Sequence, residues 1–132
     1  MYMLDTNTCV YLMSSKHPDL ARKIASIPVE DICISTITQA ELEFGVSKSH
    51  SIVKNAQALA KFISTISVIG FDTEAAEAYG VIRADLERKG NTIGHMDLLI
   101  AAHAKSQGYI IVTNNIREFS RVDGLVIENW VN

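Results

Sequence analysis

Three carboxylates in this sequence follow predicted strands or begin a predicted helix, so the fold is able to bring them together in one site. Asp5 directly follows a short apolar run that predicts a β-strand, and Glu41 lies in the helical segment after a second such run. Asp97 lies in the first turn of a mostly apolar helical segment, and its neighbours three, four and seven positions on are apolar. Carboxylates held close together need a counter-charge, which a hard divalent ion such as Mg²⁺ supplies. Such a site suits phosphodiester hydrolysis by a metal-activated water.

An amide pair, Asn114 and Asn115, follows a later apolar run at the equivalent position. Each of these polar residues also has an ordinary structural explanation. Asp5 and Asp97 suit helix N-termini, the amide pair suits a polar turn, and Glu41 suits a solvated helix surface. The sequence leaves these explanations open. Convergence of the residues at one place in the fold is what distinguishes a site from separate structural roles.

The helix that carries Glu41 also carries Glu43, and its apolar residues indicate which of the two faces inward. Ile37, Ala40 and Phe44 are expected to form the inward stripe. At about 100° per residue, Glu41 falls about 65° from the centre of that stripe and Glu43 about 95°. The spacing therefore favours Glu41 as the site residue.

The elements that must position these residues alternate between strands and helices. We expect strands at residues 2–4, 32–35, 68–69, 109–112 and 125–127. Helices are expected after the first strand up to residue 13, and then at 18–27, 36–47, 51–65, 72–90 and 95–107, with a helical turn at 117–119. Thr36 or Thr38 is expected to cap the helix that carries Glu41, and Asp72 the long helix that follows the third strand.

This order predicts an α/β fold with a central parallel sheet of four to five strands, covered by helices on both faces. The 132 residues are expected to form a single domain, 1–132, because chains below roughly 200 residues seldom divide their core. In sheets of this kind, ligands bind beyond the carboxyl ends of the strands. The three carboxylates and the amide pair are all predicted to lie at that edge.

Composition narrows the class of protein further. Two cysteines form neither a disulfide scaffold nor a zinc set, and no apolar run is long enough to span a membrane. The start of the chain lacks the pattern of a signal peptide, so a cytoplasmic protein is expected. The net charge of −3, from 12 basic and 15 acidic residues, argues against a broad basic face for nucleic acid. Any nucleic-acid binding is therefore expected to be local and metal-assisted.

Four segments together resemble a known family. They are residues 3–8 (Met-Leu-Asp-Thr-Asn-Thr), 35–45 (Ser-Thr-Ile-Thr-Gln-Ala-Glu-Leu-Glu-Phe-Gly), 93–103 (Ile-Gly-His-Met-Asp-Leu-Leu-Ile-Ala-Ala-His) and 112–119 (Val-Thr-Asn-Asn-Ile-Arg-Glu-Phe). In this order and at these spacings, they resemble the motifs of the PIN-domain ribonucleases, and within them the VapC toxins of bacterial toxin–antitoxin pairs. The resemblance covers essentially the whole chain.

The resemblance implies a PIN-like three-layer sandwich and an endoribonuclease that depends on Mg²⁺ or Mn²⁺. Asp5, Glu41 and Asp97 match the acidic triad of the family, and Asp5 and Asp97 are the expected metal ligands. Asn115 stands at the fourth acidic position, and Glu118 is the alternative fourth ligand. Four further residues of these motifs are expected near the site: Thr6, Asn7, Thr113 and Asn114.

The family also implies partners and a substrate. The residues of the first and fourth motifs resemble those of the subgroup that cuts transfer RNA, the initiator in particular. Such cleavage is expected to inhibit translation. The resemblance further implies a homodimer and a VapB-type antitoxin, whose C-terminal segment blocks the acidic groove with a basic side chain. Operator DNA is contacted only through the antitoxin, and no membrane is involved.

Three alternatives remain open. A PIN fold without catalysis would only bind RNA or a partner, although retention of the three acids argues against it. A phosphatase of the haloacid-dehalogenase type also opens with a strand and Asp-x-Asp-x-Thr, but Asn7 stands where its second Asp belongs. A CheY-like phosphoacceptor needs an acidic pair near the first strand and an Asp at the end of a central strand, and neither is evident here.

Overall fold

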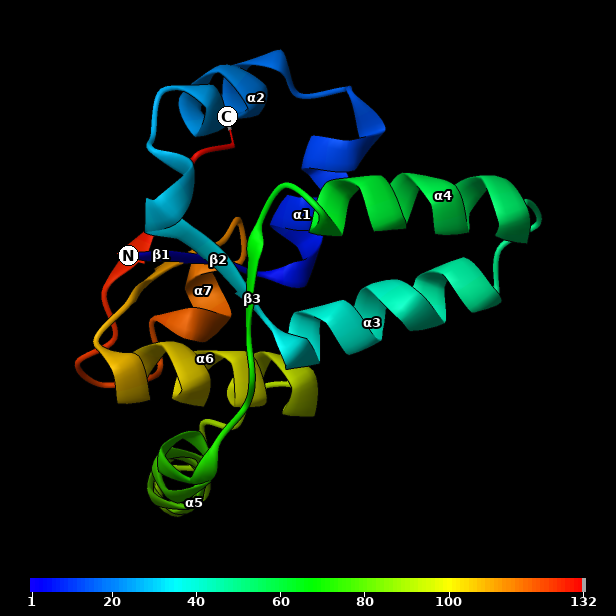
Figure 1. The fold of residues 1–132 in the computed structure, drawn as a ribbon. Coiled ribbons are helices and arrows are strands. Elements are labelled where there is room, and N and C mark those ends of the chain that lie inside the picture. The colour runs from blue at the N-terminus through cyan, green and yellow to red at the C-terminus, as the bar shows by residue number, and fades with distance from the viewer. Residues whose placement is uncertain (132) are drawn as a thin grey trace.

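The computed structural model describes residues 1–131, which form five short strands and seven α-helices (Figure 1). The strands are β1 (Tyr2–Leu4), β2 (Ile32–Ser35), β3 (Ser67–Ile69), β4 (Ile110–Val112) and β5 (Ile127–Glu128). The helices are α1 (Thr6–Ser14), α2 (Pro18–Ala25), α3 (Thr36–Ser47), α4 (Ile52–Ile63), α5 (Thr73–Arg88), α6 (His95–Gln107) and α7 (Ile116–Phe119), with a 3₁₀ turn, η1 (Val29–Asp31), before β2. No helix in this part of the chain is long and apolar enough to cross a bilayer.

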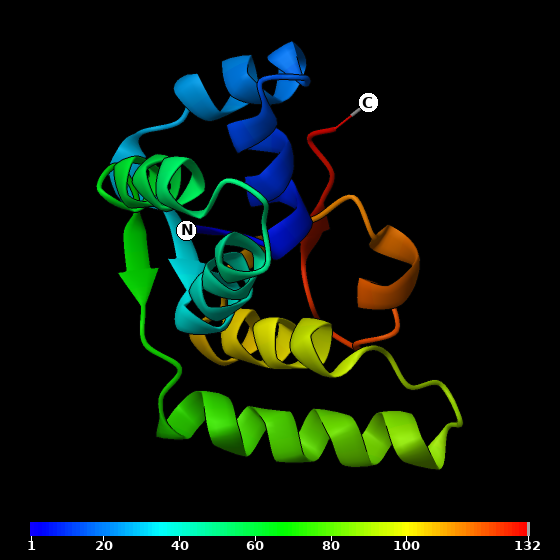
Figure 2. The same ribbon diagram turned by 90° about the vertical axis from the view of Figure 1, so that its right-hand side faces the viewer.

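All five strands pair in parallel, in the order β3-β2-β1-β4-β5. The chain builds outward from β1 to β3 and then returns to the other side of β1 for β4 and β5. Because crossovers between parallel strands are right-handed, this reversal moves the later helices to the opposite face. Figures 1 and 2 show α2 and α4 on one side of the sheet and α5 and α6 on the other. The predicted three-layer α/β fold with a parallel sheet is thus confirmed.

Two hydrophobic clusters fill the two sides of the sheet. Successive residues of a strand point to opposite faces, so Met3 belongs to the cluster beneath α5 and α6, while Leu4 belongs to the cluster beneath α1, α2 and α4. Ile111 and Val112 divide in the same way on β4. Burial on both faces explains why these strands read as continuous apolar runs rather than as alternating ones.

Polar side chains at the strand ends start the helices. Asp5 caps α1 and Asp72 caps α5, each through a carboxylate that accepts the backbone N–H of the third residue after it. Ser35 caps α3 by accepting from Ile37 N at 3.0 Å, so the expected cap at Thr36 or Thr38 is wrong. Ser35 has the extended backbone that a capping position needs, whereas Thr36 is already helical.

The structure corrects three further predictions. The 3₁₀ turn at Val29–Asp31 was not expected, and β5 begins two residues later than predicted because its pairing with β4 starts at Ile127. The predicted inward stripe of α3 is wrong: Ala40 is exposed and Phe44 is 65% exposed. Two other residues of α3, Thr38 and Leu42, are buried instead, because α3 packs on its neighbours through that face.

Truncation of a buried side chain should lower the free energy of unfolding far more than truncation of an exposed one. Ile100 is fully buried between α6 and the sheet, so Ile100→Ala should lower the free energy of unfolding by about 2–5 kcal/mol. Val81, on α5, is 71% exposed, so Val81→Ala should change it by less than about 0.5 kcal/mol. Urea denaturation of both variants measures the difference. Equal losses would contradict the placement of α6 against the sheet.

Candidate active site

The candidate site lies at the carboxyl ends of β1 and β4, which are neighbours in the sheet although 106 residues separate Leu4 from Ile110 in the sequence. The order of the strands reverses between them, and such a switch point is where open α/β sheets leave a crevice. The backbone N–H of Asp5 donates to Val112 O at 3.0 Å and continues the pairing of the two strands. The starts of α1, α3, α6 and α7 surround this edge (Figure 2).

Asp5 is held firmly at the centre of this edge. It is 2% exposed, its Oδ1 accepts from Thr8 N at 2.9 Å, and its Oδ2 accepts from Thr113 Oγ1 at 2.6 Å. Two accepting oxygens match an ionised carboxylate, and the positive N-terminal end of α1 favours its charge. Asp5 is therefore a helix cap that also lies in the candidate site, so the two explanations left open by the sequence are compatible.

Glu41 reaches the same edge from α3. Its side chain is half-buried, and its Oε1 accepts from Thr6 Oγ1 at 2.5 Å. Because Thr6 is the residue after Asp5, this bond brings the second acid beside the first. Glu43 is exposed and accepts from Gln39 on its own helix. The choice of Glu41 over Glu43 agrees with the geometry, although the stripe used to make that choice was wrong.

Asp97 meets Asn115 and Glu118 at the start of α6. The side-chain amide of Asn115 donates to Glu118 Oε2 at 2.9 Å and, more weakly, to Asp97 Oδ2 at 3.5 Å. The backbone N–H of Asn115 donates to Thr113 Oγ1 at 2.8 Å, so the same hydroxyl that holds Asp5 also places this amide. The structure thus brings both candidates for the fourth ligand, Asn115 and Glu118, beside Asp97.

The carboxylates influence one another. The pKa of Asp97 is raised to about 7, most of all by burial, and then by a hydrogen bond with Glu118 and by the negative charges of Asp5, Glu118 and Glu41. The five ion pairs found among the described residues join other side chains, on α2, on α5 and between α5 and Asp123. The site therefore gathers negative charge without a basic side chain paired to it.

This donor set suits a hard divalent cation. The available ligands are carboxylate, amide and hydroxyl oxygens, which Mg²⁺ and Mn²⁺ prefer, and the missing counter-charge is what such an ion supplies. Within residues 1–131, no three His, Cys, Asp or Glu side chains already surround a point where a metal would bind. The residues therefore fit a hard divalent ion in kind.

Of the other residues expected near the site, Thr6 and Thr113 contact the acids directly. Asn7 is exposed on α1, and Asn114 is exposed and accepts from Asn129 instead. The structure therefore shows no contact between either of these amides and the acids.

Sequence reasoning missed a buried connection behind the site. His103 on α6 is fully buried, and its Nδ1 lies 2.7 Å from Ser35 Oγ. Ser35 begins α3 and His103 lies on α6, so the contact ties together the two helices that carry Glu41 and Asp97. The available signal was the position of His103 at the end of the apolar run 98–102.

The fold and this acidic edge are those of a PIN domain. The PIN domain profile matches residues 2–125, nearly the whole chain. The chain therefore belongs to the PIN-domain family, and its relatives place it in the VapC branch. This match leaves the phosphatase and phosphoacceptor alternatives without support.

Two relatives with curated names cover almost the full chain. The "tRNA(fMet)-specific endonuclease VapC" of Salmonella typhimurium is 44% identical over 129 residues, which is 98% of this chain and 97% of the relative. "Ribonuclease VapC2" of Rickettsia felis is 45% identical over 132 residues, which is 98% of each.

Solved structures agree with these relatives. VapBC2 from Rickettsia felis, bound to a DNA fragment from its promoter, superposes with a TM-score of 0.92 at 41% identity and covers 98% of both chains. DNA-bound VapBC from Salmonella typhimurium gives 0.94 at 43% identity, with 98% of this chain and 97% of that one covered.

The crowded acids should make stability depend on pH. The pKa of Asp97 is raised from 3.8 to about 7 in the folded protein. Between these values the folded state holds a proton that the unfolded state has released, so stability should fall as pH rises from about 4 to 7. Asp97 is partly open to solvent, which reduces the fall to about 1–2 kcal/mol.

Urea denaturation at pH 4.5 and pH 7.5, in buffer without divalent ions, measures this change. Asp97→Asn removes the titrating group at nearly constant size, so its stability should vary less between the two pH values. Identical profiles for the two proteins would show that folding does not raise the pKa of Asp97.

Proposed function

We propose that this protein is a Mg²⁺-dependent endoribonuclease toxin, for which Mn²⁺ can substitute. The observation that carries the proposal is the gathering of Asp5, Glu41, Asp97 and Glu118 at the strand switch point without a basic partner. The names of its full-length relatives, which include ribonuclease and endonuclease, support it. So does the chemistry, because oxygen-ligated divalent ions are the usual catalysts of phosphodiester hydrolysis.

In this proposal, Asp5 and Asp97 hold the metal, with Glu41 beside them and Asn115 or Glu118 at the fourth position. The bound ion would lower the pKa of water and stabilise the charge that develops on the phosphate. The protein's own contribution is to fix the ligands. Thr113 keeps one oxygen of Asp5 in place, and Thr6 orients Glu41.

The proposed substrate is transfer RNA, and the initiator in particular. Two relatives at 44% and 43% identity are named tRNA(fMet)-specific endonucleases, and both match 98% of this chain. Cleavage of that RNA would inhibit translation and places the proposed activity in the cytoplasm. The net charge of −3 fits an enzyme that holds RNA through a few local contacts and its metal rather than through a basic surface.

The proposed partner is a VapB-type antitoxin, because the solved relatives are VapBC complexes. A cavity of about 390 Å³ between α1, α3 and α4 offers a place for it. The walls of this cavity are mostly apolar and include Val10 and Leu42, and Thr6 and Glu41 line it as well. An apolar segment seated there would carry a basic side chain to the acids.

The antitoxin would also make the contacts with operator DNA, as DNA is present in both solved complexes. We propose that the toxin itself is a homodimer, on the resemblance to the family. The mass of the purified protein in solution tests this assembly.

Substitution of matched glutamates tests the proposed activity. Glu41→Gln should lower the rate of RNA cleavage at least about 100-fold, because it removes a charge from the metal site. Glu43→Gln removes the same charge from an exposed position on the same helix and should leave the rate unchanged. The rates are measured with purified protein, initiator tRNA and Mg²⁺.

Two outcomes would overturn the proposal. Equal rates for the Glu41→Gln variant and the wild type would remove Glu41 from the mechanism. Cleavage by the wild type that persists in excess EDTA would remove the metal. Thermal unfolding with and without Mg²⁺ gives an independent readout, since an ion that binds only the folded state raises the melting temperature.

Substitution of two valines tests whether the antitoxin binds in the cavity between α1, α3 and α4. Val10 lines the cavity and is 46% exposed, whereas Val53 is 72% exposed and lies outside the cavity lining. Val10→Asp should weaken binding of the VapB-type antitoxin at least about tenfold by placing a charge against an apolar segment. Val53→Asp should leave the dissociation constant unchanged. Equal effects, measured by calorimetry, would place the antitoxin elsewhere.

A further inference from the structure

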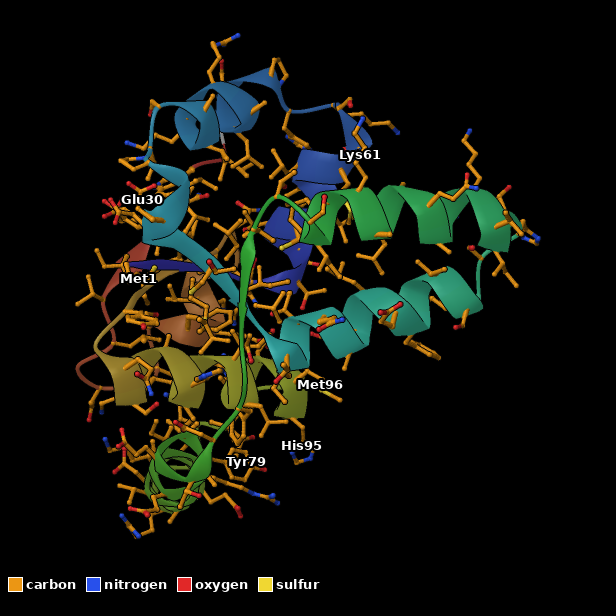
Figure 3. The ribbon with its side chains drawn as sticks, in the orientation of Figure 1. Met1, Glu30, Lys61, Tyr79, His95 and Met96 are labelled. Carbon is orange, nitrogen blue, oxygen red and sulfur yellow. The ribbon has the colours of Figure 1, made fainter. Side chains whose placement is uncertain are left out.

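A second cavity lies on the opposite side of the helix that carries Asp97. It has a volume of about 250 Å³ and lies between the C-terminal half of α5 and residues 92–98. His95 and Leu98 are nearly one turn apart on α6 and both line this cavity, whereas Asp97 projects roughly 160–200° away from His95. Figure 3 shows His95 extending from the start of α6 toward the side where α5 and Tyr79 lie.

The floor of this cavity is apolar. It is formed by Leu86 of α5, Ile93 of the connecting segment and Leu98 of α6, all of them buried. A flat, weakly polar ligand face gains free energy by covering such a floor. A nucleobase has that kind of face, and unstacked bases are what proteins bind when they read single-stranded RNA.

The rim of the cavity carries groups of both hydrogen-bonding types. Arg83 and His95 offer N–H donors, Glu87 offers an acceptor, and the rim is completed by Thr92. The guanidinium of Arg83 is already oriented, since it donates to Tyr79 Oη at 2.9 Å and to Glu87 Oε2 at 3.3 Å. The edge of a base carries donors and acceptors together, and the charge of Arg83 is already offset by its ion pair with Glu87 rather than free for a phosphate. The rim therefore favours a base over a phosphate.

This cavity is linked to the candidate active site by its rim and by α6. Arg121 Nη1 donates to the backbone oxygen of Thr92 at 2.7 Å, which fastens the rim to the segment just after α7. Glu118, beside Asp97, lies on that same helix. His95 and Asp97 share the first turn of α6. A nucleotide in the cavity would therefore lie one helix width from the acids.

We propose that this cavity, which we call the α5–α6 cavity, binds one unstacked base of the RNA, near the bond that is cut. It thereby selects the cleavage position by base identity. The proposal rests on the proposed ribonuclease function and adds to it a residue-level source of specificity. Arg83 and Glu87 are the reading groups, and Leu86, Ile93 and Leu98 form the platform beneath the base.

The experiment compares Arg83→Gln and Glu87→Gln with a matched control. Arg88→Gln removes the same charge from the same helix and also breaks an exposed ion pair, to Asp85, but Arg88 does not line the cavity. Each protein cuts a pool of short oligoribonucleotides randomised around the cleaved bond, and sequencing of the ends gives base preference at every position. Relative kcat/KM is then measured for the preferred oligonucleotide and for one with an abasic site at the selected position.

We expect the wild type to show a preference at one position near the cut, and both cavity variants to lose it. The preferred oligonucleotide should be cut about tenfold less well by the Arg83→Gln variant. The abasic site should lower kcat/KM of the wild type by about the same factor. It should change kcat/KM of the Arg83→Gln variant little, because both changes remove the same interaction. The Arg88→Gln variant should keep the wild-type preference.

Unchanged preference in both cavity variants, with cleavage intact, would overturn the proposal and leave the ribonuclease function standing. If the wild type cuts neither these oligonucleotides nor initiator tRNA, the proposed function fails instead. Binding of the same oligonucleotides, labelled with a fluorophore, then decides the cavity's role. Equal affinity of the wild type and the Arg83→Gln variant for the intact and abasic oligonucleotides would exclude it.

Discussion

Repulsion among carboxylates is the interaction that governs the candidate active site of this fold. Asp5, Glu41, Asp97 and Glu118 come from four elements, and burial, a hydrogen bond with Glu118 and the charges of the other acids together raise the pKa of Asp97 to about 7. The fold opposes this repulsion only in part, with neutral donors. Hydroxyls of Thr6 and Thr113 and the amide of Asn115 each donate to an acid. The remaining negative charge is what makes the edge suited to a cation.

The topology of the sheet explains why these acids meet at all. β1 is the central strand, and β4 is laid beside it only after the chain has built β2 and β3 on the other side. The carboxyl ends of β1 and β4 then open toward the same crevice. Asp5 and Thr113 each follow one of these strands directly, so the 2.6 Å bond between them joins the two halves of the chain. Buried contacts behind the crevice, such as that of Ser35 with His103, hold α3 and α6 at a fixed separation.

Much of this arrangement was accessible from the sequence, because strand ends and helix starts are strong local signals. The apolar runs located the strands, and the acid directly after β1 and the acid in the first turn of α6 followed from them. Phe44 shows where such reasoning stops: periodicity reveals an apolar face, but only the packing of neighbouring helices decides whether it is covered. Ser35 shows a second limit, since three hydroxyl residues within four positions, 35–38, compete for one cap and the backbone decides among them. The α5–α6 cavity was inaccessible for the same reason, because its residues are brought together by the packing of two helices.

The joining of Asp5 to Thr113 has a consequence for synthesis of the chain. Asp5 is made first, its hydroxyl partner Thr113 is added 108 residues later, and Asn115 follows. Domains of this size fold as units, so a growing chain holds only part of the acidic edge until Thr113 and Asn115 have emerged from the ribosome. The acidic edge is therefore completed only after the first four strands have been made.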